Sequence, residues 1–305
     1  MGFLNRRSGQ GGEDGEARAR RQSEDIARIA AGGIPQAAEE RLRTLGAEAG
    51  QAFTSDLSVP EFALVRRAGL EPITQVLGSC AYHVGWQFMG GGWYTTSQEL
   101  TTLSDAYNDC RKRAFDRLRV EAELAGADAV VGVRVTAARY EWATDLIEFQ
   151  AIGTAVRAPE LRTPAGPALT NLSGQDCALL LAAGHRPCGV IGATAVFFGT
   201  LYTWTQPIPT TAWGAWANVE MVGATQTWYA ARHRVLRSLE ADAAVLGAGG
   251  IVATQWGQEE RPYESGDRLA GITFIIHALA TAIAPGGGHD SAPIASILSL
   301  SKEPA

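Results

Sequence analysis

The sequence predicts an α+β protein built from two tandem β-α-β-β units. Each unit is a three-stranded antiparallel or mixed sheet with one helix layer, preceded by a short helix. Three observations support this: matches in the same order between the two halves, a long one-sided helix in each half, and two strand-like runs after each helix. The predicted divisions are a polar, partly helical or disordered N-terminal arm (1–52), copy one (53–159), a linker (160–168), copy two (169–285) and a flexible C-terminal tail (286–305).

Short motifs recur along both halves, and so many matches in one order indicate a duplication. Between the outer matches we align Leu77-Gly78 with Ile191-Gly192, which puts Cys80 opposite Thr194. The other matches are Gly69-x-x-Pro72 with Gly184-x-x-Pro187, Leu124-Ala-Gly-Ala127 with Val245-Leu-Gly-Ala248, Val130-Val131 with Ile251-Val252, and Thr154-Ala-Val156 with Thr281-Ala-Ile283.

Both copies are predicted to have the same order of elements. Copy one has a short helix at 60–68, a strand at 72–84, a long helix at 104–125 and strands at 128–141 and 146–157. Copy two has them at 175–183, 187–198, 224–246, 249–257 and 270–283. If the long helix crosses one face of the sheet, the first two strands can run parallel with the third between them.

The long helices carry one apolar stripe each, at steps of three and four residues, which indicates one buried face. The stripes are Tyr107, Cys110, Ala114, Leu118, Ala122 and Ala125 in copy one, and Trp228, Ala231, Val235, Leu239, Ala243 and Leu246 in copy two. Each helix is predicted to stop at a glycine, Gly126 or Gly247, where a left-handed cap costs least. A charged face, including Glu121, is expected on the opposite side.

The other face of so small a sheet would be left uncovered. Strand Ile272–Ile283 is nevertheless apolar at nearly every position, which indicates burial on both faces. We therefore expect either an oligomer or the other copy to pack there.

Residues Leu124–Val133 and Gly153–Val156 resemble the signature of the YbjQ family, also called UPF0145. Copy one matches well, whereas copy two diverges, with Ala253 in place of Gly132. The resemblance implies a β-α-β-β fold similar to a dodecin subunit, pentameric rings and the label "putative heavy-metal-binding". Two copies per chain could form two stacked five-fold rings or one ring of alternating copies.

Composition disfavours several classes of function. The net charge of −6 and the lack of a long basic block disfavour nucleic-acid binding. No signal peptide or cleanly apolar membrane span is seen, so membrane contact is not expected. Four scattered cysteines suit reduced thiols, and the protein is predicted to be cytoplasmic.

The best candidate metal ligands are Cys177, His185 and Cys188, because thiolate and imidazole at short spacing suit zinc or copper. The matching positions in copy one are apolar: Phe62, Leu70 and Ile73. We therefore predict that both cysteines fill core positions and that no metal is bound. Cys80 and Cys110 are likewise predicted to serve packing.

No set of residues for catalysis is found, and the protein is predicted not to be an enzyme and to need no cofactor. His277 lies on the apolar last strand opposite Gln150 of copy one, and is expected to be a core or interface histidine. The carboxylates Glu121, Asp128, Asp145 and Glu148 are expected on solvated faces.

Aromatic residues gather in the loop after the first strand of each copy. Residues 188–219 contain no charged residue at all. A subunit interface is the preferred interpretation, with internal packing and membrane or hydrophobic-ligand contact as alternatives. The candidate interface residues are Trp86, Trp93, Tyr94, Phe197, Phe198, Tyr202, Trp204, Trp213 and Trp216.

The N-terminal arm has two possible short helices, Ser23–Ala31 and Gln36–Leu45, and could be mobile or dock on the body or a partner. The arm or the C-terminal tail could hold a protein partner or cargo. Together these features predict a non-enzymatic assembly protein, a homo-oligomeric ring or shell of YbjQ-like units. Binding of a metal or small ligand is the alternative.

Overall fold

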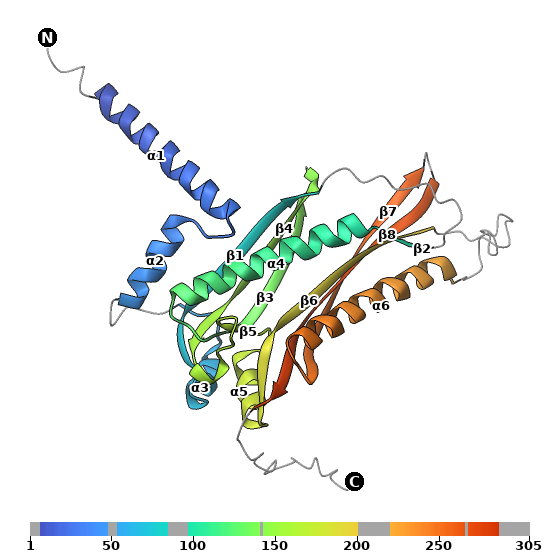
Figure 1. Cartoon of the computed structure of the whole chain (residues 1–305). Coiled ribbons are helices and arrows are strands. Elements are labelled where there is room, and N and C mark those ends of the chain that lie inside the picture. Colours follow the sequence, from blue (N-terminus) through green and yellow to red (C-terminus); the bar gives the residue numbers. More distant parts are fainter. Residues whose placement is uncertain are drawn as a thin grey trace, which may run out of the picture.

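The computed structural model describes residues 7–47, 54–84, 97–140, 143–200, 220–265 and 268–286 (Figure 1). The N-terminal part and first unit comprise α1 (Arg7–Ala30), α2 (Gln36–Ala47), α3 (Val59–Arg67), β1 (Glu71–His83), β2 (Ser97–Glu99), α4 (Thr101–Leu124), β3 (Ala129–Tyr140) and β4 (Ala143–Arg157). The elements that follow are η1 (Pro159–Leu161), β5 (Ala168–Leu169), α5 (Gly174–Ala182), β6 (His185–Thr200), α6 (Val222–Val245), β7 (Gly250–Ser265) and β8 (Arg268–Pro285).

The predicted β-α-β-β topology is confirmed in both halves. β4 lies antiparallel between β1 and β3, and β8 lies antiparallel between β6 and β7. The first and second strands of each unit therefore run parallel, as a crossover helix requires. Figure 1 shows α4 and α6 lying along their two sheets.

Each sheet gains a fourth short strand that the sequence analysis did not anticipate. β2, which precedes α4 of the first unit, pairs with β6 of the second unit, with Gln98 opposite Phe198. β5, from the segment between the units, pairs parallel with β3, with Leu169 opposite Val130. These strands depend on partners far away in sequence, and two or three residues are too short to show a period.

The predicted helix stripes form the two helix-side cores. In α4 all six stripe residues are buried, and Cys110, Leu118 and Ala122 are fully buried. In α6 the stripe from Ala231 to Ala243 is buried, whereas Leu246 is 42% exposed. Gly126 and Gly247 follow the helices with φ values of 69° and 64°.

The alignment of the first strands was wrong by one residue. Leu77 lies opposite Ile152 and Gly192 lies opposite Leu279, and these two partners are equivalent in the third strands. Leu77 therefore corresponds to Gly192, Ser79 to Thr194, and Cys80 to Ala195. Both strands have an irregularity just after their proline, so the two strands align without a gap. A slip of one residue moves every side chain to the other face of the sheet, and residue similarity alone could not detect it.

Of the four carboxylates expected on solvated faces, Glu121 is buried, Asp128 and Glu148 are partly buried, and the Asp145 side chain lies outside the described residues. Glu121 and Asp128 bind backbone donors. Glu121 is 6% exposed, and its Oε2 accepts the Leu77 N–H at 2.9 Å. Burial raises the pKa of Glu121. The Asp128 carboxylate accepts the Ala158 N–H at 3.0 Å. Both serve backbone donors that have no strand partner, a need that helical periodicity does not show.

A bulge in the second strand of each unit is shared although its residue is not. The register shifts between Val131 and Arg134 in β3 and between Val252 and Gln255 in β7. Gly132 has φ 66°, and its counterpart Ala253 has φ 53°, the one left-handed non-glycine residue among those described. The divergence at this position therefore changes the strain and leaves the backbone shape intact.

The N-terminal arm forms two helices, and α1 is longer than the predicted helix. Leu42 of α2 is fully buried and joins the core of the first unit together with Ile34. Arg117 of α4 donates to the backbone of Ile29 at 3.0 Å. Figure 1 shows α2 beside α4, with α1 extending away from the sheets.

Candidate functional site

The most elaborate polar contact in the described chain joins the two units. It lies along the outer edge of β6, which has β8 on its other side. β2 covers the far end of that edge, and three side chains of α4 cover the rest. Ser104, Asn108 and Arg111 are spaced so that all three lie on one helix face.

These side chains take the place of a neighbouring strand. Ser104 Oγ accepts the Val196 N–H at 2.9 Å. Asn108 donates from Nδ2 to the Thr194 carbonyl and accepts the Thr194 N–H at Oδ1, both at 2.9 Å. Arg111 donates to Thr194 Oγ1 at 2.9 Å and to the Gly192 carbonyl. A helix thereby satisfies a strand edge that would otherwise be open to pairing.

Arg111 is the central residue of this contact, with an exposed fraction of 8%. Burial lowers its pKa to about 10, and attraction to Asp242 opposes that shift. The guanidinium therefore stays charged at neutral pH. We call this contact between α4 and the β6 edge the seam. Since a buried charge is costly unless paired and hydrogen-bonded, Arg111 makes the seam specific for the groups that face it.

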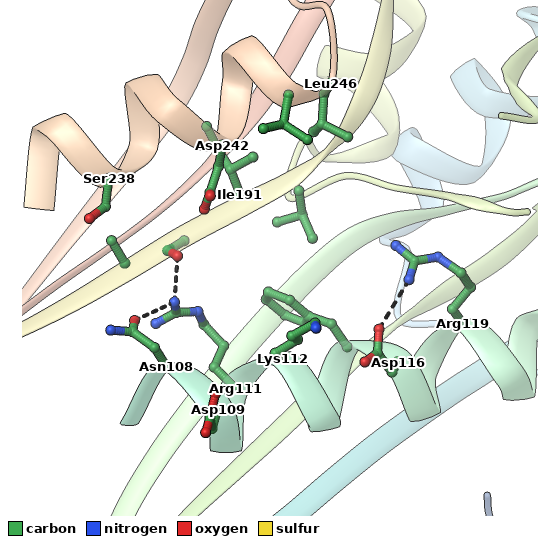
Figure 2. Close-up of a pocket in the computed structure, with 15 residues that line it drawn as sticks. Asn108, Asp109, Arg111, Lys112, Asp116, Arg119, Ile191, Ser238, Asp242 and Leu246 are labelled. Atoms are coloured by element: carbon green, nitrogen blue, oxygen red, sulfur yellow. Dashed lines mark hydrogen bonds and ion pairs between the residues drawn. The ribbon is translucent and has the colours of Figure 1, made fainter. Parts of the chain in front are cut away.

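A groove of about 460 Å³ lies next to Arg111, between α4 and α6 (Figure 2). Lys112, Asp116 and Arg119 of α4 line one side, and Ser238 and Asp242 of α6 line the other. Arg119 pairs with Asp116 at 3.3 Å. Cations and anions alternate along the groove, so it presents no single charge to a ligand.

The first unit also covers the helix-free face of the second sheet. Ile275 and Leu279 of β8 point away from α6 and belong to the core cluster of the first unit. A cavity of about 220 Å³ between the units is lined by Phe149 and Val135 from one side and by His277 from the other. The expected cover for this apolar face is thus the other copy.

The segment that opens the second unit is tied to the second sheet by a buried network centred on Thr281. Thr281 Oγ1 lies 2.9 Å from Thr170 Oγ1 and accepts the Asn171 N–H at 3.1 Å. Asn171 Nδ2 donates to the Ala253 carbonyl at 2.8 Å. The first unit repeats the central bond, because Thr154 Oγ1 accepts the Asp56 N–H at 3.1 Å.

The candidate metal ligands lie in different surroundings. Cys177 is fully buried among apolar residues, and burial raises the pKa of its thiol to about 12. Cys188 packs against the helix-side core of the second unit. His185 is exposed, with Nδ1 3.0 Å from the Ala183 carbonyl oxygen. No group of three or more His, Cys, Asp or Glu residues able to hold a metal is found within the described ranges.

The other two cysteines lie together in the first core. Cys110 is fully buried and its Sγ donates to the Cys80 carbonyl at 3.1 Å. The Cys110 thiol, with help from Arg117 and Arg113, lowers the pKa of Cys80, while that contact and burial raise the pKa of Cys110. With 4% exposure, Cys80 is shielded from solvent.

Of the aromatic interface candidates, only Phe197 and Phe198 are described. Phe197 is 9% exposed and packs in the helix-side core of the second unit, and Phe198 is half-buried opposite Gln98. Seven candidates lie outside the described residues: Trp86, Trp93, Tyr94, Tyr202, Trp204, Trp213 and Trp216.

Sequence reasoning did not identify Asn108, Arg111 or Thr281 as interface residues. One signal was available, because Ser104, Asn108 and Arg111 form a polar row beside the apolar stripe at helical spacing. A second packed face of α4 could have been inferred from that row.

Comparisons with known proteins find relatives of this chain. Residues 80–159 match a family described as "Putative heavy-metal-binding". The encapsulin nanocompartment protein Rv1762c of Mycobacterium tuberculosis is 37% identical over 224 residues, covering 72% of this chain and 81% of that protein. UPF0145 proteins of Methanosarcina acetivorans and Alkaliphilus metalliredigens are 37% and 32% identical, each over 30% of this chain and over 88% and 90% of their own lengths.

No solved structure matches the chain significantly. Within the described residues, no helix has the length and apolar character needed to cross a membrane. The topology of both sheets and the coverage of these relatives lead to one assignment. The chain belongs to the YbjQ family of UPF0145 proteins, and its two sheets are consistent with two such units in tandem.

Proposed function

We propose that this protein is a non-enzymatic assembly protein, a homo-oligomer whose ring or shell is built from its duplicated units and is pentamer-based. The observation that carries the proposal is the contact between the units. The helix of one unit closes the strand edge of the next, and its sheet covers the helix-free face of the next. The same kind of contact can be repeated from chain to chain, because each chain carries a second long helix and a second edge strand.

The name of the Mycobacterium tuberculosis relative supports this proposal. That protein is called an encapsulin nanocompartment protein, and the chain covers most of its length. We infer that this chain also acts in a nanocompartment of the cytoplasm, with the arm or tail available for a protein partner or cargo. The charge balance and lining of the groove suit protein contacts better than catalysis.

Metal binding is the alternative that the family description raises. Its support in this chain is weak, because Cys177, His185 and Cys188 have separate surroundings and Cys177 holds its proton. A thiol must lose its proton to bind a metal. We therefore propose that the family description does not apply to these three residues.

One preparation tests both functions. Native mass spectrometry and light scattering of the full chain at micromolar concentration should give one closed multiple of the chain mass. A monomer under these conditions would refute the assembly function. Elemental analysis of the same sample should find no stoichiometric metal, and stoichiometric zinc or copper that is lost in Cys188→Ala would establish the alternative.

A further inference from the structure

We propose that the exposed polar face of α6 docks on the β1 edge of a second copy of this chain, repeating between chains the contact that joins the two units within one chain. This inference rests on the proposed assembly function and specifies its interface. The internal contact serves as the template, because the duplication gives every residue in it a counterpart elsewhere on the chain.

The three α4 residues that bind the β6 edge have their counterparts on α6. The helices α4 and α6 have equal lengths, and their buried stripes align residue by residue. Ser104, Asn108 and Arg111 accordingly correspond to Thr225, Tyr229 and Arg232.

No unit packs on this second row within the part of the chain that the structure describes. Tyr229 is 59% exposed and Arg232 is also exposed. Arg232 stacks over the ring of Trp256 at 5.7 Å, and Trp256 is 42% exposed. Protein contact surfaces are enriched in aromatic residues and arginine, and this part of α6 exposes both.

The counterpart of the capped edge lies on β1. Gly192, Thr194 and Val196 correspond to Leu77, Ser79 and Ala81 in the corrected register. β1 is the edge strand of its sheet, Leu77 is 41% exposed and Ala81 is exposed. In the internal contact Val196 is fully buried, so docking would bury the Ala81 position.

Part of the β1 edge is already occupied by its own unit, and the N-terminal arm lies beside it, because Arg117 also donates to the Ile29 carbonyl. Glu121 accepts the Leu77 N–H at 2.9 Å, and Arg117 donates to the Ser79 carbonyl at 2.6 Å. The docked α6 therefore makes its new backbone contacts mainly at Ala81, through Thr225, as Ser104 does at Val196.

Charge complementarity supports a second copy as the occupant. Inside the chain Arg111 is attracted by Asp242. Their counterparts are Arg232 on one chain and Glu121 on the next. Among the described residues, Glu121 pairs with Arg41 at 3.7 Å. Glu121 is 6% exposed, whereas Asp242 is exposed, so Arg232 would be attracted to Glu121 at longer range and would not form a direct ion pair with it.

Two blocking variants test this head-to-tail geometry. Tyr229→Glu places a charge on the α6 face, and Ala81→Glu places one on the β1 edge. Each alone should reduce the assembly to a monomer, while an equimolar mixture should form a one-to-one dimer through the intact surface of each partner. Gln226→Glu is the matched control, because its counterpart Asp105 stays exposed beside the internal contact. The assembly that this variant forms should have the same number of chains as the wild-type assembly.

Native mass spectrometry distinguishes the outcomes, with circular dichroism confirming that each variant is folded. Wild-type assembly unchanged by both variants overturns this interface and leaves the proposed function standing. A monomeric wild type refutes the proposed function itself. Two monomeric variants that do not dimerise when mixed overturn the head-to-tail arrangement. If Ala81→Glu does not fold, Ala81→Lys takes its place, and Arg232→Glu repeats the α6 arm of the test.

Discussion

Exchanging glycine and alanine at the shared bulge should change stability in opposite directions in the two units. Gly132 and Ala253 both have left-handed backbone, with φ values of 66° and 53°. An added Cβ on Gly132 would meet no atom within 4 Å. The effect of Gly132→Ala is therefore a backbone effect, with no contribution from a clash.

The magnitude follows from two opposing terms. A left-handed conformation costs a residue with a Cβ roughly 1–2 kcal/mol. Replacing glycine by alanine recovers about 0.4–1 kcal/mol by restricting the unfolded chain. Gly132→Ala should thus lower the free energy of unfolding by about 0.8 kcal/mol, and Ala253→Gly should raise it by a similar amount. These changes correspond to melting-temperature shifts of about 2 °C in each direction.

Differential scanning fluorimetry on the folded chain measures both shifts. Ala137→Gly is the control, because Ala137 is an exposed residue of β3 without positive φ. The same chemical change should there lower the melting temperature, since glycine weakens a strand. If Ala253→Gly is as destabilising as Ala137→Gly, the strain assigned to Ala253 does not exist.

Three further predictions concern the contact between the units. Arg111→Leu removes the donors to Thr194 and Gly192, and should lower the free energy of unfolding in urea by about 2–3 kcal/mol; an unchanged midpoint would contradict this. Burial lowers the pKa of His277 below its ordinary value of 6.5, so the unfolded chain binds more protons at this residue. Stability is therefore lost as pH falls below 6.5 toward the folded-state pKa. His277→Gln should flatten melting temperatures measured from pH 8 to pH 5, and parallel wild-type and variant curves would refute that assignment. Thr281→Val removes the acceptor of the Asn171 N–H and should speed hydrogen exchange in the peptide that contains Asn171. Equal exchange in the variant would show that this bond does not hold the opening segment of the second unit.

Most of the framework was predictable from local patterns. The helix stripes, the turn glycines and the repeated motifs are each contained in a short window of sequence, so the topology of both units followed from them. The covered face of β8 was also visible, because its continuous apolar run requires two layers of cover.

The polar seam was less accessible. Asn108 and Arg111 look like solvated helix residues until the edge of β6 is placed beside them. Glu121 was assigned to solvent for the same reason, since its backbone donor Leu77 comes from another element. The one-residue error in aligning β1 with β6 also reflects this, because register is set by the partner strand.

The sequence by itself determined that the chain is a duplication of a β-α-β-β unit and that one sheet needs cover on both faces. Only the tertiary structure decided that the first unit provides that cover, that α4 closes the β6 edge, and that the residues of this seam have exposed counterparts on α6 and β1. The physical reason is that burial of a stripe is encoded along one helix or strand, whereas the choice of hydrogen-bond partner at a strand edge depends on elements distant in the chain.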